Sequence, residues 1–198
     1  MNQVGVPAEL QVDFGQADFW VRDVKTRLHD LVCDFPFSNV GLAQPFSGEN
    51  AECVCQGLIS VFEYIGGVPK RLIFDNATGV GRKICGIIRT SELFRAFAAH
   101  YGFNYAFCNP GAGHEKGAVE NKVGALRRNL FVPVPKFDNI DLYNRRLLDA
   151  CMEYSNKDHY IKGISERELF VEDEFALMPL PDVPFTAVSW QRIRTDKY

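Results

Sequence analysis

The stretch "ELQVDFGQADFWV", residues 9–21, decides the fold and raises the first functional question. Leu10, Val12 and Phe14 alternate with polar residues or glycine, which is typical of a strand that buries one of its faces. Asp13 therefore lies on the face opposite to these apolar side chains. The stretch predicts a core strand that presents a carboxylate.

The letters Asp-Phe-Gly also occur in protein kinases, where the aspartate holds magnesium. A kinase carries a glycine-rich loop, a strand lysine and a catalytic loop before this motif. Only twelve residues precede Asp13 in this sequence. We therefore expect a carboxylate with another role.

The rest of the chain alternates strand and helix patterns. Strands are expected at 27–35, 40–46, 70–75 and 103–109. Helices are expected at 50–67, 91–102, after the glycine-rich loop at 110–117, at 140–154 and after the capping sequence at 165–168. Gly66 and Gly102 are expected to end the first two helices. This order predicts an α/β fold, with a five-stranded mixed sheet flanked by helices and a C-terminal helical extension.

Three carboxylates come from three of these elements. Asp13 lies within the first strand, Asp75 at the end of the fourth, and Glu120 near the start of the helix after the fifth. If the first strand is central and the fourth lies beside it, the acids converge, and a divalent cation is what relieves their repulsion. Oxygen ligands favour Mg²⁺ or Mn²⁺, and two such ions suit phosphodiester cleavage and transfer.

Charge is unevenly distributed along the chain. The formal net charge is −3, but residues 150–182 hold eight acids against three bases, so the remainder is positive. The acids of this segment are expected to be solvated. Elsewhere basic residues flank the two later acids, as expected for contacts to a nucleic-acid backbone; they are Lys70, Arg71, Arg82, Lys83 and Arg89 near Asp75, and Lys116, Lys122, Arg127 and Arg128 near Glu120.

Two negative observations narrow the class of protein. The six cysteines form no Cys-x-x-Cys pair, so they are expected to be small buried side chains without a metal. No apolar run reaches the roughly 18–20 residues that span a bilayer, and the N-terminus lacks a signal-peptide pattern. We expect a cytoplasmic protein without a membrane segment.

Three segments together resemble the catalytic core of retroviral integrases, and most closely that of IstA-type bacterial insertion-sequence transposases. They are "QVDFG" (11–15), "LIFDNAT" (72–78) and "GHEKGAVENKVGALRRNLF" (113–131). Asp75 is followed by Asn76, and Glu120 by Asn121, as in that family. The 44 residues between Asp75 and Glu120 exceed the spacing typical of retroviral integrases, and the excess is expected within residues 77–90.

This resemblance implies an RNase H-like fold and a DDE transposase that cleaves element ends and joins the 3′-hydroxyls to target DNA. It implies two magnesium ions per active site, with Asp13 bridging both, Asp75 on one and Glu120 on the other. Residues 1–131 would form the catalytic core, 132–182 a linker and helical extension, and 183–198 the start of a β-barrel-like unit. A homo-multimer on DNA, an N-terminal helix-turn-helix region and an AAA+ ATPase helper are also implied.

Several residues are predicted to contact DNA: Lys116, Lys122, Arg127, Arg128, Asn76 and His114. Arg127 and Arg128 are open to a second interpretation, as a solvated helix face. Gly15 and Gly124 are expected to leave room for a substrate strand.

Rival carboxylates exist for two of the three positions. Glu115 competes with Glu120 but lies in the loop before the helix. Asp18, expected after a strand break at Gly15, and Asp23 compete with Asp13. Two other functions stay open, a nuclease of the same fold that hydrolyses without joining and an inactive DNA-binding relic.

Overall fold

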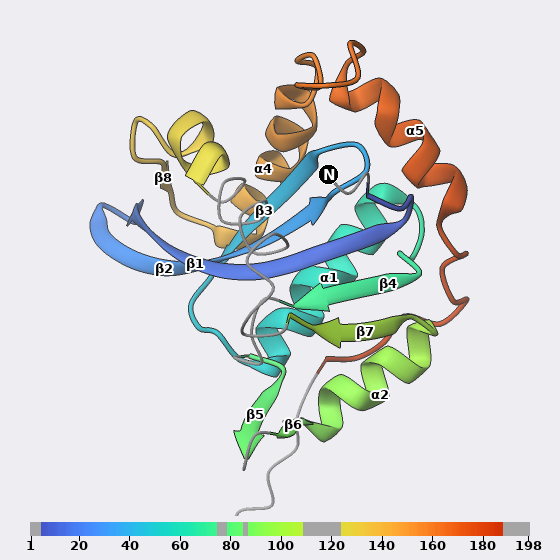
Figure 1. Cartoon of the computed structure of the whole chain (residues 1–198). Helices are drawn as coiled ribbons and strands as arrows, with labels where there is room; N and C mark the ends of the chain where they lie inside the picture. Colours follow the sequence, from blue (N-terminus) through green and yellow to red (C-terminus); the bar gives the residue numbers. More distant parts are fainter. Residues whose placement is uncertain (1–4, 75–78, 85–86, 109–123, 188–198) are drawn as a thin grey trace, which may run out of the picture.

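The computed structural model describes residues 5–74, 79–84, 87–108 and 124–187. Its main sheet is mixed, with strand order β3-β2-β1-β4-β7 and β8 paired to β1 (Figure 1). The strands are β1 (Glu9–Val21), β2 (Val24–Phe35), β3 (Val40–Phe46), β4 (Arg71–Phe74), β7 (Asn104–Phe107) and β8 (Lys136–Phe137). The five predicted strands are confirmed, with the first one central and the fourth beside it.

Strand β1 organises the sheet. It pairs antiparallel with β2 and parallel with β4, while β4 pairs parallel with β7. A two-residue turn joins β1 to β2, and both of its residues, Arg22 and Asp23, have positive φ angles of 49° and 63°. Such a turn matches the right-handed twist of the two strands. The predicted break at Gly15 is wrong, because β1 continues through it to Val21.

Three strands lie outside the predicted pattern. β8 falls in the segment "VPVPKFD", which reads as a proline-rich junction, and only Lys136 and Phe137 pair with β1. The excess at 77–90 contains a separate antiparallel hairpin of β5 (Gly81–Ile84) and β6 (Ile87–Thr90). The insertion therefore adds its own small sheet beside the core.

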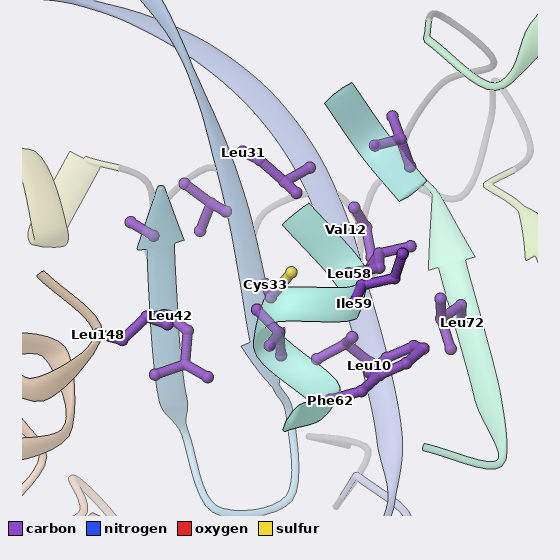
Figure 2. Close-up of a cluster of buried hydrophobic side chains, with 14 of the residues drawn as sticks. Leu10, Val12, Leu31, Cys33, Leu42, Leu58, Ile59, Phe62, Leu72 and Leu148 are labelled. Atoms are coloured by element: carbon purple, nitrogen blue, oxygen red, sulfur yellow. The ribbon is translucent and has the colours of Figure 1, made fainter. Parts of the chain in front are cut away.

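Helix α1 (Ala51–Ile65) covers one face of the main sheet. Asn50 caps its first turn and Gly66, with φ of 74°, ends it. Figure 2 shows side chains of α1 packed against residues of β1, β2 and β4. The face that α1 covers includes Leu31, because a Cβ on Gly57 of α1 would lie 2.4 Å from a methyl group of Leu31.

Helix α2 (Glu92–Tyr101) extends this layer toward β7. Ser91 caps its start, and Gly102, with φ of 74°, ends it. Phe94 packs edge-on against Phe74 of β4 at a centroid distance of 5.3 Å. Both predicted helix ends are confirmed.

Helices α4 (Ile140–Tyr154) and α5 (Glu166–Ala176) form the predicted extension. The side chain of Asn144 on α4 donates to the carbonyl of Pro45 on β3, and Phe170 of α5 packs edge-on against Phe35 of β2. The capping box at the start of α5 is present. These helices therefore pack against the strands of the core. The division into a core, an extension and a β-barrel-like unit stays a prediction, and residues 188–198 lie outside the described residues.

The expectation that the acids of 150–182 are solvated is wrong for two of them. Glu166 and Asp173 are 1% and 0% exposed. Glu166 accepts from Asn39 and lies 3.6 Å from the amine of Lys157, while Asp173 accepts from the backbone N–H of Ala8 at 2.8 Å. The two acids tie α5 to segments far away in the sequence.

The expectation that the cysteines are buried holds for only some of those that the structure describes. Cys33, Cys55 and Cys151 are buried, whereas Cys53 and Cys108 are half-buried. Within the described part of the chain, no three metal-binding side chains form a group. None of the helices in that part is long and apolar enough to cross a bilayer.

Asp173 gives the domain a pH-dependent stability. Burial raises the pKa of its carboxyl above 3.8, against opposing hydrogen bonds from Ser38 and Ala8. The native state therefore binds this proton more tightly than the unfolded chain, and stability falls as the pH rises from 3.8 through the raised pKa. Asp173→Asn keeps an oxygen for the Ala8 N–H and removes the titration. The free energy of unfolding of this variant should therefore increase relative to that of the original chain as the pH rises.

Urea unfolding at a series of pH values measures this difference. Glu172→Gln, a change at the exposed neighbour on the same helix, is the matched control and should give a difference that does not vary with pH. Parallel curves for the original chain and Asp173→Asn would contradict the prediction.

Candidate active site

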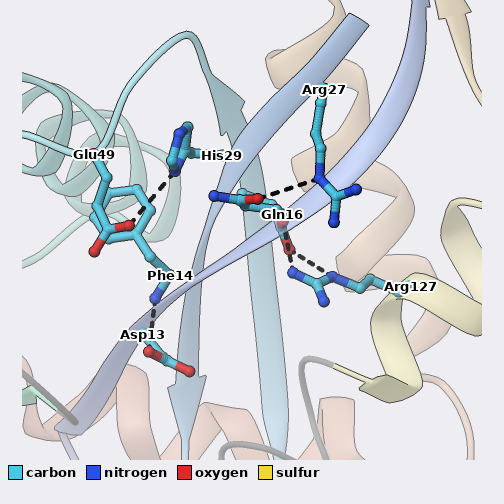
Figure 3. A network of polar contacts seen from close by, with 8 residues as sticks. Asp13, Phe14, Gln16, Arg27, His29, Glu49 and Arg127 are labelled. Carbon is cyan, nitrogen blue, oxygen red and sulfur yellow. Dashed lines mark hydrogen bonds and ion pairs between the residues drawn. The ribbon is translucent and has the colours of Figure 1, made fainter.

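Asp13 lies in the middle of β1, opposite Val32 of β2. Its side chain is half-buried, and its Oδ1 accepts a hydrogen bond from the N–H of Phe14 at 2.8 Å (Figure 3). Successive side chains on a strand point to opposite faces. Asp13 therefore shares a face with Gly15, away from the face that holds Val12 and α1.

Strand β4 ends beside Asp13. In the parallel pairing of β1 and β4 the last register pair is Val12 with Phe74. Asp13 follows Val12 in the chain, and Asp75 follows Phe74. Asp75 itself lies outside the described residues. The prediction that the first and fourth strands lie side by side is confirmed, and the confirmed pairing extends to the residue before each acid.

Most other predicted site residues also lie outside the described residues: Glu120, Asn76, His114, Lys116 and Lys122, as well as the rival Glu115. The described part of the site consists of Asp13, Arg127 and Arg128. Residues 124–130 are helical, in agreement with the predicted helix.

Arg127 makes an ion pair that the sequence did not indicate. Its Nε and Nη2 donate to the two carboxylate oxygens of Asp30 at 3.0 and 2.8 Å (Figure 3). The side chain of Asp30 is fully buried, whereas that of Arg127 is 31% exposed. Arg127 is therefore bound to a buried carboxylate of β2. This contact fits neither of the two roles expected for Arg127, a solvated helix face or a simple phosphate contact.

Asp30 escaped prediction because its only local signal is an acid inside the apolar strand pattern "RLHDLVCDF". Burial raises the pKa of Asp30, and the guanidinium of Arg127 opposes that rise. Asp30 is the register partner of Gly15 on β1. The contact between these three residues can be recognised only once the β1–β2 register and the position of the helix at 124–130 are known.

Gly15 is needed for this ion pair. A Cβ at Gly15 would lie 1.6 Å from Nη2 and 2.6 Å from Cζ of Arg127. The expectation that Gly15 leaves space for a substrate strand is therefore wrong, because the guanidinium fills that space. Gly124 differs, because the atom nearest to a Cβ there is Nη1 of the exposed Arg128 at 3.0 Å, so its expected role stays a prediction.

Arg128 differs from its neighbour. Its side chain is exposed, and the structure gives it no carboxylate partner within the described ranges. Among the other predicted bases, Arg71 pairs with Glu9 at 3.3 Å, and Lys70 and Arg89 are exposed. Among the predicted bases whose side chains the structure describes, Arg128, Lys70 and Arg89 are therefore the most accessible to a ligand.

The opposite face of β1 carries a separate polar pair. His29, the register partner of Gln16, lies with its Nδ1 3.5 Å from a carboxylate oxygen of Glu49. Gln16 accepts from Nε of Arg27 at 3.2 Å. Asp18, the rival of Asp13, pairs with Lys25 of β2 at 3.0 Å, near the exposed end of the β1–β2 pair. None of these three contacts brings a further acid to Asp13.

Comparison with other proteins agrees with this fold. No protein-family model matches the chain. A putative transposase of the element IS5376 from Geobacillus stearothermophilus is 28% identical over 194 residues, which cover 95% of this chain and 48% of that protein. A transposase from Aminobacter aminovorans is 30% identical, with 85% of this chain and 34% of that protein covered. The IS21 transposase of Pseudomonas aeruginosa is 28% identical, with 89% and 46% covered.

The chain is related to insertion-sequence transposases. It spans about half or less of the length of these relatives. Among solved structures, the catalytic core domain of BIV integrase has a TM-score of 0.59 at 16% identity and covers 86% of this chain and 97% of that one. A chain of the simian T-cell lymphotropic virus intasome in complex with the PP2A regulatory subunit B56 gamma has a TM-score of 0.57 at 16% identity, covering 100% and 63%. This transposase-like domain therefore has the predicted integrase-core, RNase H-like fold.

Gly15→Ala tests the close packing of Arg127 on β1 in this transposase-like domain. The added Cβ displaces the guanidinium and leaves the buried Asp30 carboxylate without its cation. Removing one partner of a buried ion pair costs about 3–5 kcal/mol of unfolding free energy, and the partial exposure of Arg127 places this pair toward the lower end of that range. Denaturant unfolding should show a loss of that size.

Gly48→Ala is the control, because a Cβ there would have Asn50 Nδ2 as its nearest neighbour at 3.7 Å. If the unfolding free energy of Gly15→Ala lies within about 0.5 kcal/mol of that of this control, the close packing of Arg127 on Gly15 is contradicted.

Proposed function

We propose that this domain is the catalytic part of a DDE transposase, which cleaves the ends of a mobile DNA element and joins the freed 3′-hydroxyls to target DNA. The observation that carries the proposal is the parallel pairing of β1 and β4, whose last register pair immediately precedes Asp13 and Asp75. Consecutive Cα atoms are about 3.8 Å apart, so this pairing limits how far the two acids can separate. Transposase similarity along most of the chain supports the same activity.

Asp13, Asp75 and Glu120 are the proposed catalytic residues. Asp13 lies on a strand that pairs on both sides, which restricts its motion and favours precise placement of its carboxylate. Arg127, whose guanidinium lies at Gly15 two residues along β1, is engaged by Asp30. The acids therefore need another source of positive charge when they come together.

Magnesium or manganese fits this donor set, because carboxylate oxygens are the ligands that these ions prefer. We propose two ions per active site, with Asp13 holding both, Asp75 one and Glu120 the other. Bound there, the ions supply stabilisation of negative charge on the attacking and leaving oxygens of a phosphodiester. The chain itself supplies the half-buried setting of Asp13 and the fixed spacing of β1 and β4.

DNA is the proposed substrate, and the predicted contacts Lys116, Lys122, Asn76, His114 and Arg128 are proposed to bind its backbone. Among them Arg128 is described, and its exposure suits a phosphate contact. Cutting and joining two element ends calls for a homo-multimer on DNA, and the IS21-type relationship suggests an AAA+ ATPase helper. Because the substrate is chromosomal or plasmid DNA, the proposed site of action is the bacterial cytoplasm.

Carboxamide variants of the acids test the proposal. Asp13→Asn and Glu120→Gln remove one negative charge each with little change of shape, so cleavage and joining of element-end DNA in Mg²⁺ should fall at least about 100-fold. Gel analysis measures both steps, since joined products are longer than the input strand. Calorimetry with Mn²⁺ on the isolated chain should show binding that Asp13→Asn weakens.

Asp18→Asn and Glu115→Gln are matched controls, being the rival acids on the same strand and in the same glycine-rich segment. Both should behave like the original chain. Shortened products without longer ones would indicate the nuclease that hydrolyses without joining. Mn²⁺ binding that does not depend on Asp13 would indicate an inactive relic.

A further inference from the structure

We propose that Asp30 is a positioning residue of this active site, which fixes Arg127 so that the helix at 124–130 is held against the face of β1 that carries Asp13. The inference rests on the proposed function, because it concerns the alignment of the segment that follows Glu120. Neither the sequence pattern nor the similarity to transposases assigns a role to Asp30.

The contact joins three elements at one point. Asp30 belongs to β2, Gly15 opposite it belongs to β1, and Arg127 comes from the helix. Gly15 and Asp13 are two residues apart on the same face, which corresponds to about 7 Å along the strand. The ion pair therefore anchors the helix within one side-chain length of the proposed catalytic strand position.

A bidentate ion pair constrains orientation in a way that apolar packing does not. The helix segment is also held by the buried Leu126, and Phe131 packs edge-on against Phe19 at 5.1 Å. Such apolar contacts are non-directional and tolerate sliding. The planar guanidinium fork bonded through Nε and Nη2 fixes both the distance and the rotation of Arg127 relative to Asp30.

Orientation of this helix matters for the reaction. Glu120 lies seven residues before Arg127 in the chain and four before Gly124, where the described helix begins. A catalytic carboxylate must be held within about 0.5 Å of its productive position. Loss of the Asp30 contact would therefore reduce turnover even where the domain stays folded and binds DNA.

The two neighbouring arginines have different roles in this proposal. Arg127 is bound by a fully buried carboxylate, so its charge is compensated within the protein. Arg128 is exposed, and the described ranges hold no acid bonded to it. We assign Arg127 to positioning and Arg128 to the DNA backbone.

Three variants separate these roles. Asp30→Asn keeps the shape but removes the charge, and Arg127→Lys keeps the charge but removes the planar fork. Both should lower strand-transfer turnover at saturating DNA at least about 10-fold, while DNA affinity stays within about 2-fold and its salt dependence is unchanged. Arg128→Gln should do the reverse, weakening DNA binding and reducing the salt slope by about one.

Asp18→Asn is the control for the loss of a carboxylate from the paired strands β1 and β2, because Asp18 pairs with Lys25 at an exposed site. Its turnover should equal that of the original chain. If Asp30→Asn does not fold, the double variant Asp30→Leu with Arg127→Met replaces the ion pair by apolar side chains, which preserves stability in many proteins. That variant should fold and still have the lowered turnover.

Amide exchange gives a readout that needs no activity. In Asp30→Asn, exchange within residues 124–130 should be at least about 10-fold faster, with no change in α1. Unchanged exchange there, or original turnover in any folded variant without the ion pair, would overturn the role of Asp30. An original chain without divalent-ion binding or activity would instead overturn the proposed function, and the exchange result would still decide whether Asp30 holds the helix.

Discussion

The pairing of β1 on both of its edges is the constraint on which the rest of the structure depends. Its antiparallel partner β2 brings Asp30 opposite Gly15, and its parallel partner β4 ends beside Asp13. One strand thus sets the position of the proposed catalytic acid and that of the ion pair next to it. Since a one-residue slip would turn every side chain of a strand to the other face, both arrangements depend on the same register.

The parts of the fold that the sequence predicted are those with a local cause. Alternating apolar residues marked β1, and helix ends were marked by Gly66 and Gly102, which adopt the positive φ that glycine favours. The three candidate acids were marked by their places within a strand, at the end of a strand and near the start of a helix. For Asp13 the structure agrees with that placement, whereas Asp75 and Glu120 lie outside the described residues.

What the sequence did not predict has a non-local cause. Asp30 is bonded to a residue 97 positions away, and Asp173 to one 165 positions away. Neither acid has a neighbour in sequence that reveals its partner, so each looked like an ordinary charged residue. Gly15 was interpreted as open space for the same reason, because the guanidinium that fills that space comes from a distant helix.

Buried acids in this domain are balanced in two different ways, and the difference is informative. Asp173 accepts hydrogen bonds from two neutral donors, Ser38 and the N–H of Ala8. Asp30 instead receives a full positive charge in a fixed geometry. Replacing such a pair with apolar residues is often neutral or stabilising, so stability alone is a weak reason to keep it. The directional hold that it gives to Arg127, beside the strand of Asp13, is the stronger one.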